Sequence, residues 1–372
     1  MLRFDLILIG FGNVARRFVR LLDELRPDLA REHEIDTRVV GIATRTRGQI
    51  YDGSGLRAVK LATAVERGEA VGRRGTTSGF LNRALARSAA AARQRRLIVV
   101  ETTTLNVTRG EPAIGYVRAA LRGGAHVVTA NKGPAAFAYR SLSDTAAEAK
   151  RCFLFESAVL DGVPVFNLRR AAMPGVTIGG FYGVINSTTN YILTAMEQGE
   201  TFGGALAAMQ RAGIAEADPS LDIEGWDAAA KTAVLANVLL GAELTPQRVE
   251  REGLTAAAAE RIRQARAVGR RLKLIASAEK AGGIVRGRVR LVEIPDTDLL
   301  AGLEGQQNAL ILQTDLLGEV AIVQRGWGLT QTAFGLVSDL VSIAREVRQT
   351  RATRQARRRA RPGRSPSARA RR

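Results

Sequence analysis

The sequence is poor in residues that carry disulfide and metal chemistry. Its 372 residues include one cysteine, Cys152, and two histidines, His33 and His126. One cysteine excludes an internal disulfide, and the run Cys-Phe-Leu-Phe is typical of a buried packing residue. The histidines stand far apart in the sequence, and neither has a neighbour at metal-ligand spacing. The sequence therefore argues against a zinc site.

Long hydrophobic runs are also lacking. No apolar run approaches the roughly 20 residues needed to cross a bilayer, and the first strand pattern begins at Leu6 without a signal-peptide pattern before it. We therefore expect a cytoplasmic protein without a membrane-spanning segment. A length of 372 residues with 46% hydrophobic residues predicts a globular protein of about two domains.

Acidic residues are scarce at the C-terminal end. Residues 345–372 hold twelve arginines and one glutamate, a net charge of +11, which leaves +8 of the chain's +19 for residues 1–344. The segment has no core-forming pattern, so we expect a disordered, solvated tail. Because no aromatic residue lies between its arginines to stack on bases, we do not expect nucleic acid as a partner.

Short apolar runs alternate with helical patterns in residues 1–150. This alternation predicts a dinucleotide-binding domain of the α/β class, with a Rossmann-like, doubly wound parallel sheet. The predicted strands are Leu6–Ile9, Val39–Ala43, Leu97–Val100 and Val127–Thr129, and the predicted helices are Val14–Leu25, Phe80–Arg95 and Glu111–Arg122. An exposed loop is expected over Gly68–Gly79.

Residues 151–325 mix strand and helix patterns, which predicts a second, α+β domain. A last helix, Thr332–Arg348, is expected to return to the first domain through residues 326–344. The predicted strands are Thr177–Asn186, Arg286–Glu293, Ala309–Thr314 and Val320–Val323, and the predicted helices are Tyr191–Gln198, Phe202–Ala212, Asp227–Leu240 and Thr255–Leu272.

A glycine-rich loop, Gly10-Phe11-Gly12-Asn13-Val14-Ala15, follows the first strand and opens a helix. Gly10 permits a tight turn, and Gly12 lets the backbone approach a pyrophosphate. The helix N-terminus at Asn13 and Val14 offers free N–H groups to the phosphates. The loop therefore predicts a dinucleotide site, with a glycine turn that binds no ligand as the alternative.

The end of the second strand bears on which dinucleotide binds. An NAD site usually has an acid there, whereas this strand ends Ala43-Thr44-Arg45-Thr46-Arg47. The guanidinium of Arg45 suits the extra phosphate of NADP. We predict NADP, with NAD possible. The strand lies far from the glycine loop, because Arg26–Thr37 reads as an inserted loop.

The richest cluster of acids precedes a helix that carries one lysine. Glu216, Asp218, Asp222, Glu224 and Asp227 lie in one turn, and Lys231 follows Asp227 by four residues. Val234, Leu235 and Val238 share the helical stripe of Lys231, so that lysine falls on the face expected to be buried. Since burying an unpaired ammonium is costly, we interpret Lys231 as a catalytic lysine. The alternative is a helix-start salt bridge between Asp227 and Lys231.

Two polar turns add candidate residues. Lys132, in Thr129-Ala130-Asn131-Lys132-Gly133-Pro134, ends a strand at the edge where doubly wound folds bind ligands. It points to cofactor or substrate, or is simply solvated. Thr188 and Asn190 lie in Asn186-Ser187-Thr188-Thr189-Asn190, a turn that either caps the next helix or holds a substrate carboxylate.

Together with Glu156-Ser157-Ala158-Val159, these motifs resemble those of the homoserine dehydrogenase family, in the same order, over residues 1 to about 344. The resemblance implies reversible NAD(P)H-dependent reduction of L-aspartate 4-semialdehyde to L-homoserine, the branch step toward threonine, isoleucine and methionine. It also implies a homodimer formed through the second domain. We expect a short form, with the arginine tail in place of a C-terminal regulatory module.

The resemblance also implies roles for single residues. Lys231 and Asp227 would lie at the reacting end of the substrate, with Lys132 beside the nicotinamide as the alternative proton donor. Thr103 would line the cofactor cleft. Substrate binding would involve Glu216, Asp222, Thr188 and Asn190, and a structural monovalent cation such as sodium would be bound through Glu156, Val159, Asp161 and Val163.

Two other functions fit parts of the sequence. An aspartate-semialdehyde dehydrogenase would need a thiolate near a base, and Cys152 has no histidine near it in the sequence. A non-catalytic dinucleotide-sensing protein, tethered to nucleic acid by its tail, would have no use for Lys231 or Glu216.

Overall fold

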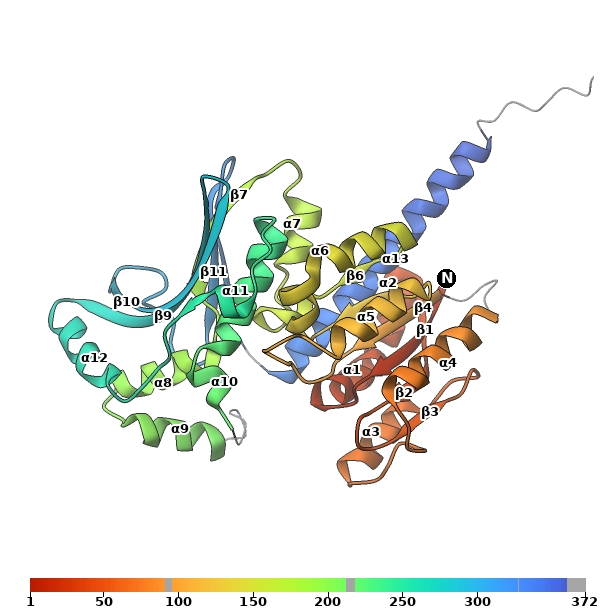
Figure 1. Ribbon diagram of the computed structural model, residues 1–372, viewed down its shortest axis with the longest axis horizontal. Helices are drawn as coiled ribbons and strands as arrows, with labels where there is room; N and C mark the ends of the chain where they lie inside the picture. Colours follow the sequence, from red (N-terminus) through yellow and green to blue (C-terminus); the bar gives the residue numbers. More distant parts are fainter. Residues whose placement is uncertain (91–95, 212–217, 327, 360–372) are drawn as a thin grey trace, which may run out of the picture.

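The computed structural model describes residues 1–90, 96–211, 218–326 and 328–359, and it places two six-stranded sheets side by side along the long axis (Figure 1). The first sheet has the order β3-β2-β1-β4-β5-β6, and all its pairs are parallel except β2 with β3. The predicted parallel sheet is confirmed. Its strands are β1 (Leu2–Ile9), β2 (Ile35–Ala43), β3 (Gln49–Tyr51), β4 (Arg96–Glu101), β5 (His126–Thr129) and β6 (Phe153–Leu154).

Alternation along β1 explains why helices cover both faces of this sheet. Ile7 and Ile9 enter one core with α4, α5 and α6, whereas Leu6 and Leu8 enter another with α1 and α3. All four are fully buried, and each contributes roughly 1.5–3 kcal/mol by that burial. The helices are α1 (Asn13–Glu24), α2 (Arg26–His33), α3 (Ala58–Glu66), α4 (Thr77–Ala90), α5 (Ala113–Arg122) and α6 (Lys132–Ala149).

The second sheet has the order β12-β11-β7-β9-β10-β8 and is antiparallel apart from the pair β8–β10. Helices α8, α11 and α12 pack on it. The strands are β7 (Ile178–Val184), β8 (Glu250–Arg251), β9 (Arg270–Ala281), β10 (Ile284–Pro295), β11 (Asn308–Thr314) and β12 (Gly318–Gln324), and the helices are α7 (Phe166–Ala172), α8 (Ser187–Glu197), α9 (Phe202–Arg211), α10 (Ser220–Ile223), α11 (Trp226–Leu239) and α12 (Ala258–Ala267).

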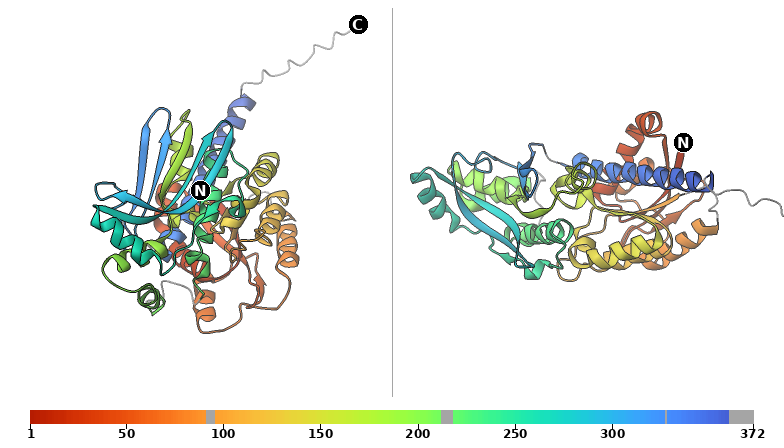
Figure 2. Two further views of the ribbon diagram at one scale, coloured as in Figure 1. Left: turned by 60° about the vertical axis from the view of Figure 1, so that its left-hand side comes forward. Right: turned by 90° about the horizontal axis from the view of Figure 1, so that it is seen from above.

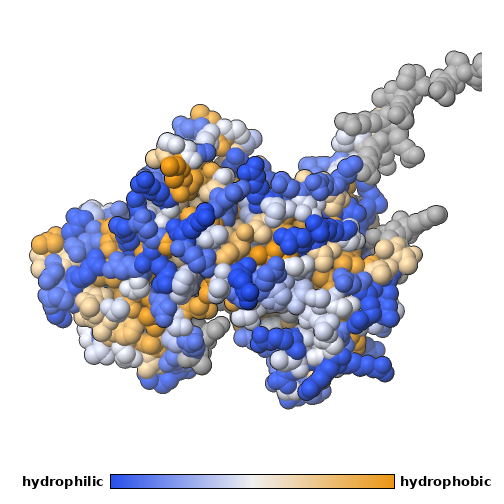
Figure 3. All heavy atoms as spheres, viewed as in Figure 1, coloured by the Kyte–Doolittle hydropathy of each residue, from blue (hydrophilic) through white to orange (hydrophobic). Residues whose placement is uncertain are grey.

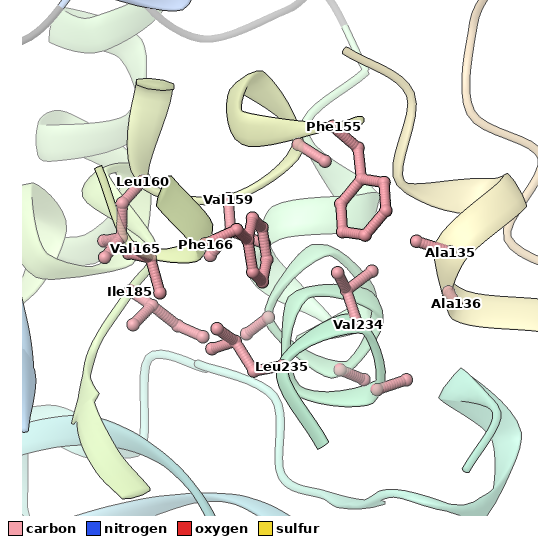
Figure 4. Close-up of a cluster of buried hydrophobic side chains, with 14 of the residues drawn as sticks. Ala135, Ala136, Phe155, Val159, Leu160, Val165, Phe166, Ile185, Val234 and Leu235 are labelled. Carbon is pink, nitrogen blue, oxygen red and sulfur yellow. The ribbon is translucent and has the colours of Figure 1, made fainter. Parts of the chain in front are cut away.

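One apolar cluster joins the two halves of the molecule. Val234 and Leu235 of α11 point toward Phe155 and Phe166, and Ala135 of α6 approaches from the other side (Figure 4). The rings of Phe155 and Phe166 lie 5.0 Å apart, edge to face. Small residues such as Ala135 let α6 and α11 pack closely, so the polar residues at their N-terminal ends are brought together.

The C-terminal helix α13 (Leu329–Arg359) returns from the second half and lies along the first, with its end projecting beyond the body (Figures 1 and 2). The expected return of the chain is therefore observed. The expected disorder from residue 345 is wrong as far as Arg359, because alanine and arginine extend an established helix readily. Residues 360–372 lie outside the described residues. The buried positions of α13 are Ala333, Leu336, Val337, Leu340, Ile343 and Ala344.

Three further expectations differ from the structure. The expected loop Arg26–Thr37 contains α2, with Pro27 in its first turn, and the start of β2. The helix predicted to reach Leu272 ends at Ala267, because pairing with β10 draws the residues from Arg270 into β9. Strand β6 pairs with β5, so the first sheet continues past the expected domain boundary at residue 150.

In the described ranges, every helix is either too short or too polar to cross a lipid bilayer. The exposed surface shown in Figure 3 is mostly hydrophilic, and it is hollowed between the two lobes that the sheets define.

Candidate active site

The glycine loop between β1 and α1 leaves room for a pyrophosphate. Gly10 has a φ of +93°, and a Cβ there would lie 2.7 Å from backbone atoms of Thr102, so only glycine fits. At Gly12 a Cβ would have no atom within 4 Å. Helix α1 begins at Asn13 without a side-chain cap, so no capping side chain takes up the N–H groups of its first turn. This arrangement suits dinucleotide phosphates.

Arg45 follows the carboxyl end of β2, the neighbour of β1. The turn is closed by Thr44, whose N–H donates to the Gly48 carbonyl at 3.0 Å and whose hydroxyl accepts from the Arg47 N–H at 2.8 Å. Arg47 donates to the carbonyl of Gly68. Arg45 is exposed, and its guanidinium makes no hydrogen bond or ion pair with any described residue. Its guanidinium is therefore available to a ligand.

Glu101 organises the loops next to the glycine loop. Its carboxylate accepts hydrogen bonds from the Thr103 N–H and from the Thr129 hydroxyl, both at 2.7 Å. Asn131 donates to the Thr103 carbonyl at 3.1 Å, and its side-chain oxygen caps α6. Since Lys132 is the first residue of α6, this network fixes the point from which the Lys132 side chain starts.

One carboxylate, Asp227, lies between two lysines of different helices. Lys231, one turn further along α11, has its Nζ 2.9 Å from Oδ2 of Asp227, and Lys132 has its Nζ 3.1 Å from Oδ1. Lys231 also donates to the Ile185 carbonyl at 2.8 Å. The three charged side chains are 12% (Lys231), 16% (Asp227) and 21% (Lys132) exposed. They form a mostly buried cluster with one open side.

The polar turn before α8 belongs to the same cluster. The amide nitrogen of Asn186 donates to Asp222 at 2.7 Å and to Asp227 at 3.0 Å. Thr188 donates to the other oxygen of Asp222 at 3.0 Å. Asn186 also caps α8 by accepting from the Thr189 N–H at 2.9 Å. The turn therefore both caps a helix and holds the carboxylates.

The charges in this cluster depend on one another. Burial opposes ionisation of Asp227, but the two adjacent ammonium groups hold its pKa below the ordinary value. Burial also opposes the charged form of Lys231, yet the carboxylates of Asp227, Asp161 and Asp222 raise its pKa. Burial and the charge of Asp227 raise the pKa of Asp222. Lys231 is therefore kept protonated and able to donate a proton.

Comparison with known proteins identifies the family. Residues 164–341 match the family described as homoserine dehydrogenase. An NAD(+)-dependent homoserine dehydrogenase of Pseudomonas canavaninivorans is 36% identical over 345 residues, which cover 92% of this chain and 97% of that protein. The chain belongs to the homoserine dehydrogenase family. A homoserine dehydrogenase of Methanocaldococcus jannaschii is 33% identical over 346 residues, with 91% and 98% covered.

A homoserine dehydrogenase of Thiobacillus denitrificans has the same fold, with a TM-score of 0.77 and 29% identity over 92% of this chain and 73% of that one. Since the likeness spans both sheets, the predicted fold class and the predicted family are confirmed. The chain has the fold of the homoserine dehydrogenases, a family of oxidoreductases.

Two of the residues that the resemblance to homoserine dehydrogenases placed at the substrate need comment. Asn190 is fully buried, and its amide donates to the carbonyls of Gly305 and Gln307 at 3.0 and 3.1 Å while its oxygen accepts from Lys273 at 3.2 Å. These contacts hold the loop before β11, and the expected role of Asn190 in binding substrate stays a prediction. Glu216 lies outside the described residues.

The resemblance to homoserine dehydrogenases implied a cation site in the loop after Glu156. Several backbone hydrogen bonds hold this loop. The Glu156 carboxylate accepts the N–H groups of Val165, Phe166 and Asn167 at 2.6, 2.8 and 2.7 Å at the start of α7. Between Val159 and Val163, Leu160 and Asp161 adopt left-handed φ values of 50° and 47°. The loop therefore bends sharply and is rich in oxygen atoms.

A second buried acid lies against this loop. Asp339 of α13 accepts the N–H of Glu156 at 2.8 Å. Burial raises the pKa of Asp339, and the neighbouring Glu156 raises it further; burial also raises the pKa of Glu156. The two acids therefore oppose each other's ionisation.

Glu101, Asn131 and Asn186 are polar residues of this site that the sequence did not single out. Glu101 is the last residue of a buried strand, and a buried carboxylate at that position signals a binding or positioning role. Asn131 and Asn186 stand immediately before helices, as capping residues do. Capping alone does not reveal that the same side chains also reach across the site.

Proposed function

We propose that the chain catalyses the reversible NAD(P)H-dependent reduction of L-aspartate 4-semialdehyde to L-homoserine. The cluster of Lys132, Asp227 and Lys231 carries this proposal, because it adjoins the carboxyl edge of the first sheet, where doubly wound folds bind ligands. Membership of the homoserine dehydrogenase family supports the choice of substrate.

In the proposed mechanism, Lys231 donates the proton. When bound, the reduced nicotinamide supplies a hydride to the aldehyde carbon. Negative charge then develops on the carbonyl oxygen, which Lys231 stabilises and protonates as general acid. In the reverse direction the same amine accepts the proton of the homoserine hydroxyl. Asp227 orients Lys231 and favours its charged form.

The remaining acids are proposed to bind the substrate ammonium. Asp222 is held by Asn186 and Thr188 within the cluster, and Glu216 lies a few residues earlier in the same acidic segment. The wild-type enzyme should therefore bind an analogue of homoserine that lacks the amino group more weakly than homoserine. The Asp222→Asn variant should discriminate less between homoserine and this analogue. Equal discrimination in both proteins would reject the role of Asp222.

Assay of the purified protein with homoserine and NADP or NAD, followed by absorbance of the reduced nicotinamide, tests the reaction. Lys231→Met should lower kcat by about 10²–10⁴-fold, the usual contribution of a general acid. Lys132→Met serves as the comparison, because Lys132 contacts the same carboxylate. If Lys132→Met abolishes turnover while Lys231→Met retains it, Lys132 is the proton donor.

The cofactor is proposed to be NADP. The exposed guanidinium of Arg45 after β2 supports a 2′-phosphate site, and the open space at Gly12 supports the pyrophosphate. Thr103 is proposed to line the cleft. The relative from Pseudomonas canavaninivorans is named NAD(+)-dependent, which keeps NAD as the second candidate. The ratio of kcat/KM for NADPH to that for NADH decides between them.

Two further features of the family are proposed for this chain. A monovalent cation such as sodium is proposed to bind oxygen atoms of Glu156, Val159, Asp161 and Val163, supported by the buried acids there. An equal thermal midpoint in sodium and choline chloride would reject it. A homodimer is proposed through the second sheet, with sedimentation velocity as the measurement.

A thiol-dependent reaction is not supported. Burial raises the pKa of Cys152 to about 11, and the residue lies just before β6, at the sheet edge opposite the lysine cluster. A nucleophilic cysteine needs a lowered pKa.

A further inference from the structure

A cavity opens at the amino edge of the first sheet, away from the proposed active site. Its volume is about 1070 Å³. Arg96 and His126 begin β4 and β5, whereas Glu101 and Thr129 end the same parallel strands beside the proposed active site. The length of the strands therefore separates the cavity from the glycine loop and the lysine cluster.

The lining of this cavity is strongly basic. Of its two acids, Asp5 is already paired with Arg38 at 2.8 Å, and Glu346 is exposed on α13. Its five cationic residues come from four segments of the chain: Arg96, Lys150 with Arg151, Arg170, and Arg351. No single helix face gathers these charges, so they converge because of the tertiary fold.

Among the described residues, Arg96 has no partner in this cavity. It is partly buried, and its guanidinium makes no ion pair or hydrogen bond with the residues that the structure describes. Burial lowers the pKa of Arg96, and the nearby charges of Arg351 and Arg151 lower it further. The hydroxyl of Ser88, on the same wall, is buried and has no hydrogen-bond partner within the described part of the chain. The two groups are donors on one wall from which an anion could accept hydrogen bonds.

Arg151 is pre-oriented for such an anion. Its Nε donates to the Gly124 carbonyl, and its Nη1 donates to the Lys150 carbonyl at 2.9 Å. These backbone contacts fix the plane of the guanidinium at the cavity wall without neutralising its charge. A planar, fixed guanidinium is well suited to two-point contact with phosphate oxygens.

We propose that this cavity binds a small molecule that carries a phosphate or pyrophosphate group, held by Arg96, Arg151 and Arg351. The volume admits a metabolite larger than inorganic phosphate. Arg351 lies on α13, the helix that also packs on α1 and on the loop after Glu156. The ligand would therefore bridge the end of α13 to the amino edge of the sheet.

His126 provides a reporter inside the cavity. Its Nδ1 accepts the Cys152 N–H at 3.1 Å. Burial, together with the charges of Arg151 and Arg96, lowers the pKa of His126 to about 4. A phosphate bound among these arginines favours the imidazolium and must raise that pKa. The chain has one other histidine, His33, which does not line the cavity and serves as an internal control.

The test is an NMR titration of the imidazole resonances of the full-length protein with sodium pyrophosphate at constant ionic strength. We expect the resonances of His126 to shift and its pKa to rise, with His33 unchanged. Arg96→Gln and Arg351→Gln should each weaken pyrophosphate binding by about tenfold or more, as expected for loss of a charged hydrogen bond. Arg345→Gln, an exposed change on the same helix outside the cavity, should leave binding unaltered.

Three results would overturn the proposal. The first is pyrophosphate binding that leaves His126 unchanged and disappears with excess NADPH or NADH, which would place the anion at the glycine loop. The second is equal binding by the wild type and by Arg351→Gln, whose exposed side chain can be changed without disturbing the fold. The third is tighter binding of citrate than of pyrophosphate, which would replace phosphate by a polycarboxylate. Activity of the enzyme is not needed for any of these readouts.

Discussion

Asp227 forms ion pairs with two lysines at once, because each of its two oxygens contacts a different ammonium group. With both lysines charged, the three side chains carry a net charge of +1. Such a cluster attracts a developing alkoxide, and the carboxylate limits the repulsion between the lysines. Removing one partner of a buried charge group is usually severe, because the remaining charges lose their compensation.

Asp227→Asn should therefore change the pH dependence of the reaction as well as its rate. In the wild type, kcat/KM for aldehyde reduction should fall only as pH rises through the pKa of Lys231, which lies above the ordinary 10.5. The neutral amide removes a negative charge, so the pKa of Lys231 falls and the alkaline limb moves to lower pH. The rate at pH 7 should drop by about 10²-fold or more.

A pH–rate profile of both proteins checks this expectation. Asp23→Asn, an exposed change at the end of α1, is the matched control and should leave the profile unaltered. An alkaline limb at the same pH in Asp227→Asn would show that Lys231 does not donate the proton.

The exposed position of Arg45 leads to a prediction about which cofactor the enzyme prefers. Arg45→Ala should lower kcat/KM for NADPH by about tenfold or more and leave that for NADH nearly unchanged, since one charged contact to phosphate is lost. Arg47→Ala is the control, because the Arg47 guanidinium already bonds to the Gly68 carbonyl. An equal effect of Arg45→Ala on both cofactors would contradict a phosphate contact.

The contact between residues one helical turn apart was predictable from the sequence, whereas the contact between residues on separate helices was not. The pairing of Asp227 with Lys231 follows from the i, i+4 spacing, whatever the rest of the chain does. The approach of Lys132 depends on how α6 crosses α11, which the small residues around Ala135 decide. The contacts of Asn190 were not predictable either, because its amide donates to backbone carbonyls of a loop more than 100 residues away in the sequence.

Among the elements, α13 is held unusually close to the loop after Glu156. At Gly335 a Cβ would lie 2.6 Å from the Ser157 hydroxyl and 2.8 Å from Cα of Gly162. Gly162 itself has a φ of +80° and faces α13 with the same lack of space. Two glycines thus let a helix and a loop meet backbone to backbone, which keeps Asp339 within reach of the Glu156 N–H.

Gly335→Ala should therefore destabilise the protein, against the usual preference of helices for alanine. Overpacking of this kind costs about 1–3 kcal/mol in the free energy of unfolding. Gly203→Ala in α9 is the control, because a Cβ there meets nothing within 4 Å. It should stabilise the protein by up to about 1 kcal/mol. Urea unfolding measures both, and equal effects would contradict the close packing of α13.

Secondary structure was predictable where the apolar period was clear. The strands of the first sheet follow from their apolar runs, because a parallel strand buried on both faces is apolar throughout. Strand β9 was missed, since its Ala, Lys and Glu residues favour helices and only pairing with β7 and β10 makes it a strand. The length of α13 was missed because it depends on continuation from a packed helix.

On the scale of the whole molecule, an apolar row across the second sheet is buried at its centre, at Ala309 and Val184, and exposed at its edge. Val323 of β12 is 43% exposed, and it pairs with Ala309, which pairs with Val184. Side chains paired across neighbouring strands share a face. This row of apolar residues ends at an edge strand, a position that another chain readily covers.

Val323→Lys should therefore weaken the proposed homodimer. A buried, unpaired ammonium at the centre of an interface disfavours association, whereas the folded monomer tolerates it on an exposed position. Sedimentation velocity should show a slower species at micromolar concentration. Lys280→Glu, an exposed change at the far end of β9, is the control for altered charge. A wild-type protein that sediments as a monomer would reject the proposed dimer.

The return of α13 to the first sheet has a consequence for how the protein is made. Leu336, Leu340 and Ile343 complete the core that Leu6 and Leu8 begin. While a ribosome is still translating the second half, that face of the first half has no cover, so its apolar surface stays open to chaperones or to premature association. The nucleotide-binding half emerges first but can reach its full stability only after the last helix has been synthesised.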